Sequence, residues 1–185
     1  MDTKIKMIKA AFPSQLSDDI NTICDLYPEF YTSNIHEDSS EREKCFIQGE
    51  TVHLLSRVYA EPLPSEALSV SQQCILNCYF CCHCNGYVRE EHLKRIIHQP
   101  YEWVIPYVMR ELGSYVKNII DLIYLKRHEL NPNTYKDFLK NNPSYFTLTK
   151  ARVLSYWNEY HRRTVSQTNY SGFKMIDFLE NLMQN

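Results

Sequence analysis

The chain has 185 residues, of which 44% are hydrophobic and 23% are charged, and its formal net charge is −2. This length suits one domain with its own hydrophobic core. The sequence has only 4 glycines but 14 tyrosines, and so few glycines disfavour all-β folds and glycine-rich phosphate loops.

The charge is spread unevenly along the chain. Residues 1–66 carry 12 acidic and 6 basic side chains, a balance of −6, whereas residues 67–185 carry 10 and 14, a balance of +4. One interpretation is a pair of solvated surfaces. The other is that the acidic first third of the chain meets a basic partner.

The sequence predicts a cytoplasmic protein with no membrane segment. Lys4, Lys6 and Lys9 interrupt the N-terminal stretch, which therefore lacks the apolar run of a signal peptide. No window approaches the roughly 18 apolar residues of a membrane helix. The 7 cysteines are clustered and odd in number, a pattern that favours free thiols in a reducing compartment.

The first third of the chain predicts two helices and a loop. Apolar residues recur at helical spacing over 4–12, and a second helix follows from the capping residue Ser17. Residues 32–44 are polar and predict a mobile loop. Residues 51–60 fit a strand or a helix equally well, so at most one short β-hairpin is expected.

Helical patterns dominate from residue 69 onward. Ser69 or Ser71 can cap a helix that the dipeptide Asn85-Gly86 would end, and a further helix spans 89–97. The longest pattern, 103–130, predicts one central, deeply buried helix with close packing or a bend at Gly113.

Three shorter patterns complete the chain. A helix is expected over 134–140, and Thr147 or Thr149 can cap the next one. A polar linker at 164–171 separates it from a last amphipathic helix over 173–183. The sequence therefore predicts an all-α fold, a single helical domain over 1–185 built as an irregular multi-helix bundle, with stacked HEAT-like helical hairpins as a specific variant.

Five cysteines within eleven residues form the stretch that most resembles a chemical site: Cys74, Cys78, Cys81, Cys82 and Cys84. A zinc site needs about four ligands, usually from two separated pairs, and no second Cys-x-x-Cys pair lies elsewhere in the sequence. Because four of the five continue a helical stripe, we expect them to be buried core residues. A metal site and a redox pair are the alternatives.

No sequence motif of a catalytic site is present, so we expect a protein that is not an enzyme and needs no cofactor or metal. The histidines are scattered, without the paired spacing of metal ligands. Basic residues mix with aromatic ones near the C-terminus, among them Arg152, Arg162 and Arg163. We interpret this mixture as a solvated helix face over an aromatic core, and expect no nucleic-acid binding because the whole chain is slightly acidic.

Four short stretches carry a resemblance to known proteins: GYVRE at 86–90, WVIPY at 103–107, LGSYV at 112–116 and SYWN at 155–158. Between residues 50 and 163 the sequence resembles small bacterial helical proteins of the toxin-immunity type. The resemblance implies a helical protein that binds and neutralises a cognate toxin. Its motifs are helix-packing patterns, so they imply no site residues.

The leading hypothesis is therefore a cytoplasmic bacterial immunity protein whose partner is a toxin domain, for example a basic nuclease. The contact surface would draw on the acidic first third of the chain, and the predicted partner-binding residues are Glu37, Asp38, Glu41 and Glu43. The alternatives are a metal-binding or redox protein built on the cysteine cluster, and a helical adaptor with no toxin partner.

Overall fold

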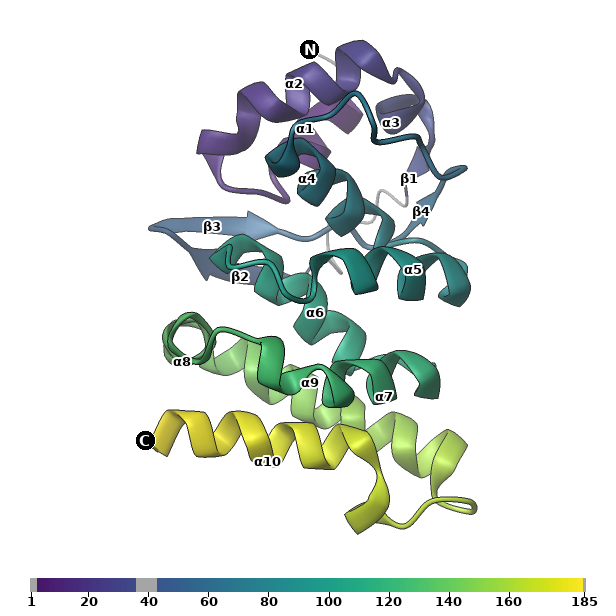
Figure 1. The fold of residues 1–185 in the computed structure, drawn as a ribbon, viewed down its shortest axis with the longest axis vertical. Helices are drawn as coiled ribbons and strands as arrows, with labels where there is room; N and C mark the ends of the chain where they lie inside the picture. Colours follow the sequence, from purple (N-terminus) through teal and green to yellow (C-terminus); the bar gives the residue numbers. More distant parts are fainter. Residues whose placement is uncertain (1–2, 36–42, 185) are drawn as a thin grey trace. The chain divides into compact units, whose positions relative to one another are not determined.

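The structure is a computed structural model that describes residues 3–35 and 43–184. These residues form a predominantly helical protein (Figure 1), which confirms the predicted all-α class. The chain divides into two compact units, Met1–Ile96 and Ile97–Asn185, called unit 1 and unit 2. The expectation of one domain over 1–185 stays a prediction.

Unit 1 is built from short helices around two small β-pairs. Asp19 joins two of the helices, because its carboxylate accepts hydrogen bonds from Ser71 Oγ and Gln72 Nε2, both at 2.9 Å. The helical elements of this unit are α1 (Thr3–Lys9), η1 (Ser14–Leu16), α2 (Ser17–Leu26), α3 (Glu29–Thr32), α4 (Val70–Phe80) and α5 (Gly86–Ile96).

Two antiparallel pairs supply the β-structure of unit 1. The hairpin pairs β2 (Lys44–Ile47) with β3 (Glu50–His53), and its two-residue turn places Gln48 and Gly49 at positive φ, 52° and 85°, as a type I′ turn requires. The second pair joins β1 (Asn34–Ile35) to β4 (Val58–Tyr59).

The sequence fitted a strand or a helix over residues 51–60. The structure has strands at both ends of this stretch, β3 at its start and β4 near its end. The polar segment 32–44 is shorter as a loop than predicted, because β1 and the start of β2 lie inside it. The predicted mobile centre of that segment, 36–42, lies outside the described residues.

Helix α4 confirms the predicted cap and corrects the predicted end. Ser69 Oγ accepts the Gln72 N–H while the Gln72 side chain accepts the Ser69 N–H, which is a complete capping box. The helix ends at Phe80, before the predicted stop at Asn85-Gly86. That dipeptide begins α5 instead: Asn85 Oδ1 accepts the Tyr87 N–H, and Gly86 is not in the left-handed region.

Every regular element that the structure describes in unit 2 is a helix. Helix α10 (Ser171–Gln184) contacts α7 (Lys117–Leu125), α8 (Pro132–Asn141) and α9 (Pro143–Tyr156), as Figure 1 shows. The remaining elements are η3 (Glu102–Val104), α6 (Ile105–Leu112), η4 (Arg127–Glu129), the π-helix η5 (Trp157–His161) and η6 (Gln167–Asn169). The last of these lies within the predicted linker at 164–171.

The sequence predicted one continuous helix over 103–130. This prediction is wrong, because the segment is divided into separate helices. Helix α6 ends at Leu112, and α7 begins only at Lys117. A Cβ on Gly113 would lie 3.2 Å from the Arg152 side chain, so α9 packs closely against the break. The predicted burial is confirmed, since Leu112, Ile119 and Ile120 are all 0% exposed.

Helix α9 also begins earlier than predicted. Pro143 occupies its first turn, where a missing N–H costs nothing. Thr147 and Thr149 lie inside the helix, and each hydroxyl donates to the carbonyl four residues earlier, at 2.9 and 3.0 Å. They therefore cap no helix.

Among the helices that the structure describes, none combines the length and apolar character needed to cross a membrane.

Candidate functional site

The cysteine cluster lies in the core of unit 1. Cys74, Cys78, Cys81 and Cys82 are at most 3% exposed, which confirms the predicted burial. Burial, followed by the neighbouring thiols, raises the pKa of Cys78 well above its usual value, so this thiol is poorly suited to nucleophilic or redox chemistry. Across residues 3–35 and 43–184, no three His, Cys, Asp or Glu side chains gather in a metal-binding group.

The residues that follow the cluster join loops of unit 1 together. His83 Nε2 donates to the Ala60 carbonyl at 2.9 Å, and its Nδ1 accepts the Asn85 N–H at 3.0 Å. The buried Arg89 guanidinium donates to the carbonyls of His83 and Cys84 at 3.0 and 3.3 Å. His83 Nδ1 and the Arg89 guanidinium thus hold the turn between α4 and α5, and His83 Nε2 joins that turn to the segment after β4.

The predicted partner-binding acids are only partly visible. Glu37, Asp38 and Glu41 lie outside the described residues, and Glu43 is half-buried just before β2. The carbonyl of Glu43 accepts the Leu54 N–H at 2.9 Å, and one of its carboxylate oxygens is buried. Because three of the four lie outside the described residues, the role of these acids stays a prediction.

Unit 2 carries a surface cluster of three tyrosines that the sequence did not single out. The rings of Tyr115, Tyr156 and Tyr160 are mutual neighbours, with centroids 6.0 to 6.2 Å apart. Tyr115 is 45% exposed and Tyr160 is 57% exposed, while Tyr156 is half-buried between them. We call these three residues the tyrosine face.

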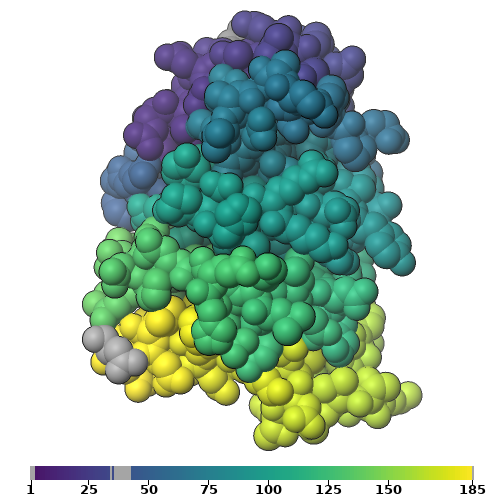
Figure 2. All heavy atoms as spheres, viewed as in Figure 1, coloured from purple at the N-terminus to yellow at the C-terminus, as the bar shows by residue number. Residues whose placement is uncertain are grey.

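Two irregularities of the backbone assemble the tyrosine face. The break after α6 places Tyr115 in the linker to α7, and α9 continues into the π-helix that carries Tyr160. The N–H of Arg162 donates to the Trp157 carbonyl at 2.8 Å, five residues back, which defines the wider turn. Wider turns of this kind recur at functional sites in helices. The segment after residue 157 lies at the molecular surface in Figure 2, in yellow-green.

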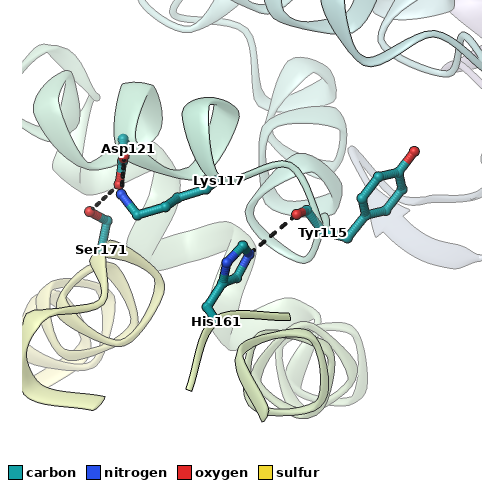
Figure 3. Close-up of polar contacts among 5 residues, drawn as sticks. All are labelled: Tyr115, Lys117, Asp121, His161 and Ser171. Carbon is teal, nitrogen blue, oxygen red and sulfur yellow. Dashed lines mark hydrogen bonds and ion pairs between the residues drawn. The ribbon is translucent and has the colours of Figure 1, made fainter. Parts of the chain in front are cut away.

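Polar contacts hold the linker and the π-helix in place (Figure 3). His161 Nε2 donates to the Tyr115 carbonyl at 3.3 Å, and the Tyr115 ring points away from this contact. Asp121 on α7 accepts the Ser171 hydroxyl at 2.6 Å and forms an ion pair with Lys117. The middle of α7 is thereby joined to the start of α10, and His161 joins the linker to the π-helix.

A layer of aromatic side chains supports the same segment from inside. Tyr170 is 0% exposed, stacks on His161 at 5.4 Å and meets the Phe173 ring at 5.8 Å. The Trp157 indole donates to the Val165 carbonyl at 2.9 Å. Burial and, secondarily, the Asp121 charge raise the pKa of Tyr170 to about 12, so this phenol stays neutral.

The polar groups near the tyrosine face do not form a nucleophilic site. The Ser171 hydroxyl donates to the Asp121 carboxylate, which also forms the ion pair with Lys117, so both groups serve to join α7 to α10. His161 contacts a backbone carbonyl, so it does not orient a nucleophile. These groups position the surrounding backbone.

A second feature of unit 2 is a shallow polar depression of about 370 Å³, lined by Glu102, Thr134, Asp137, Lys140 and Asn141. Desolvation and, to a smaller extent, the Asp137 charge raise the pKa of Glu102. The lining side chains are two carboxylates, a hydroxyl, an ammonium group and an amide, so the depression lacks a third acidic ligand for a metal ion.

Sequence reasoning missed the tyrosine face, although part of its signal is visible. Arg152, Tyr156 and Tyr160 follow one another at steps of four, which puts them on one helical side. The position of Tyr115 depends on the break at Gly113, which no local pattern specifies.

Comparison with family models, with curated proteins and with solved structures yields no match to this chain.

Proposed function

We propose that this chain is a non-enzymatic protein-binding protein, and that the tyrosine face of unit 2 contacts its partner. The observation that carries the proposal is the exposure of Tyr115 and Tyr160 in one contiguous aromatic cluster. Tyrosine and arginine are enriched among the residues that dominate binding energy, because they combine a large apolar area with polar tips.

The fixed geometry of the cluster supports the same proposal. Binding is weakened by the entropy of ordering side chains and loops, which costs roughly 0.5–1.5 kcal/mol per side chain. Here the His161 contact already holds the Tyr115 backbone, and the three rings restrict one another. Folding therefore already orders this surface, and less conformational entropy would be lost when a partner binds.

The more specific proposal is a bacterial immunity protein that neutralises a toxin domain in the cytoplasm. Its support is the resemblance over residues 50–163 together with the acidic first third of the chain. A toxin that acts on nucleic acid is basic, so that acidic surface would speed its association. The tyrosine face would then supply most of the binding energy.

Two alternatives differ from this proposal in what they require. A redox protein built on the cysteine cluster needs a reactive thiol, whereas Cys78 is 0% exposed and its pKa is raised. A metal-binding protein needs several ligands around one point, and among the described residues no three His, Cys, Asp or Glu side chains form such a group. A helical adaptor would use the same tyrosine face on a partner that is not a toxin. The identity of the partner separates the adaptor from the immunity protein.

The experiment first tests the products of the neighbouring genes for toxicity and for binding to this chain, and then uses the toxin domain so identified. We expect the wild-type chain to protect cells that express the toxin, and the double variant Tyr156→Ala/Tyr160→Ala to lose protection. Its affinity in calorimetry should fall at least tenfold, about 1.4 kcal/mol or more. The matched control is Tyr87→Ala, which removes a tyrosine that is 79% exposed in unit 1.

Circular dichroism and thermal unfolding would show that the double variant is folded, and Tyr160→Ala alone serves if it is not. Unchanged affinity in a folded Tyr160→Ala variant and in the double variant would refute the proposal. Binding of a protein that is not a toxin, with the same loss in the variants, would favour the adaptor.

A further inference from the structure

The polar depression of unit 2 has no part in the proposed function. It has a volume of about 370 Å³, and its lining side chains come from two elements: Glu102 from η3, and Thr134, Asp137, Lys140 and Asn141 from α8. From the shape and the charges of this depression, we propose that it binds a small basic α-amino acid such as lysine. The proposal goes beyond protein binding and does not depend on the tyrosine face.

The fold holds the lining residues in place. Asn131 caps α8, since its Oδ1 accepts the Thr134 N–H at 3.2 Å. Thr134, Asp137 and Asn141 then follow at steps of three and four, so they lie on one side of the helix. The other element, η3, contacts α8 and is anchored by its buried Trp103. The polar groups are therefore arranged before any ligand arrives.

The two carboxylates of the depression lie close enough to repel each other. Desolvation and, to a smaller extent, the Asp137 charge raise the pKa of Glu102. Within the part of the chain that the structure describes, no ion pair joins either carboxylate to Lys140 or to another cation. A cationic group placed between the carboxylates would relieve their repulsion and would itself be favoured there.

The remaining groups determine what kind of cation fits. The depression carries two negative charges and one positive charge, which a basic amino acid complements with two cationic groups and one carboxylate. The cationic groups would face Glu102 and Asp137, and the ligand carboxylate would face the Lys140 ammonium and the Asn141 amide. The Thr134 hydroxyl can donate or accept.

Size and ligand number agree with a small organic ligand. The volume is near the lower end of the range of about 300–1,000 Å³ for small-molecule pockets, which suits a ligand of amino-acid size. A calcium ion takes about six or more oxygen ligands, whereas this depression offers two carboxylates beside an ammonium group.

The probe is L-lysine, titrated into the full chain while NMR follows the backbone amides. L-norleucine has the same carbon skeleton without the side-chain ammonium, and cadaverine is the same diamine without the carboxylate. We expect L-lysine to shift the amides of residues 101–104 and 132–141, with a Kd of about 1 mM because the site is open to solvent. Both comparison compounds should bind at least tenfold more weakly.

Substitutions assign the charges to their roles. Glu102→Gln/Asp137→Asn removes both negative charges at almost constant side-chain size and should weaken L-lysine binding at least tenfold. The matched control Glu159→Gln removes an exposed acid of unit 2 that does not line the depression, and it should leave binding unchanged. Lys140→Gln should abolish the preference for L-lysine over cadaverine. The substituted residues are exposed or half-buried, so the variants should keep the wild-type circular dichroism.

Four results would each overturn the proposal. They are the absence of saturable shifts with L-lysine up to about 10 mM, equal binding of L-norleucine, full binding by the double variant, and binding of Mg²⁺ at the same amides with equal affinity.

Discussion

Acidification tests the environment of His92 in the core of unit 1. His92 is 5% exposed, and its Nδ1 donates to Asn77 Oδ1 at 2.7 Å, since the Asn77 amide nitrogen donates to the Gln73 carbonyl. Its ring stacks on Phe80 at 4.7 Å. Burial, with smaller contributions from the charges of Arg95 and His83, lowers the pKa of His92 from 6.5 to about 4.

The sign and size of the effect follow from this difference. Between pH 6.5 and about 4 the unfolded chain binds a proton at His92 and the folded protein does not. Stability therefore falls as the pH drops through this window and levels off below it. The full difference corresponds to roughly 3 kcal/mol, and residual solvent screening reduces it to about 2 kcal/mol.

The assay is urea unfolding of the wild type and of His92→Asn at about pH 7 and about pH 4.5. Because other groups also titrate in this range, the measured quantity is the difference in pH dependence between the two proteins. We expect the loss of unfolding free energy between about pH 7 and about pH 4.5 to be about 2 kcal/mol smaller in His92→Asn than in the wild type. In the exposed control His98→Asn this loss should equal that of the wild type. Equal pH dependence in the wild type and His92→Asn would refute the reasoning.

Four further predictions concern the core. A thiol reagent should label only the half-buried Cys84 in the folded protein and all 7 cysteines after unfolding. Cys78→Ser should cost about 1–3 kcal/mol of unfolding free energy, as a buried hydroxyl without an assured partner does. Ile119→Ala should cost about 2–5 kcal/mol by chemical denaturation. Gly172→Ala should cost about 1–3 kcal/mol, since its Cβ would lie 2.7 Å from the Tyr170 ring.

Local patterns in the sequence predicted those features that local energetics determine. The N-cap of α4, for which the sequence offered Ser69 or Ser71, and the buried cysteine stripe depend on residues three and four positions apart, which a sequence displays directly. The last amphipathic helix was recognisable for the same reason, and the structure places it at Ser171–Gln184.

Features that depend on distant residues were not predictable in this way. Apolar periodicity continues across Gly113, so the sequence indicated one helix, and the close approach of Arg152 accompanies its division. Asn85 and Gly86 resemble a helix stop, but the Asn85 side chain caps the following helix. The tyrosine face joins Tyr115 to Tyr160 across 45 positions, and only the tertiary fold brings them together.

We propose that a protein partner binds at the tyrosine face. Hydrogen exchange of the chain, alone and saturated with its partner, locates the contact without any substitution. We expect slower exchange over residues 113–117 and 156–163 in the complex. Slower exchange confined to unit 1, with these two segments unchanged, would contradict it.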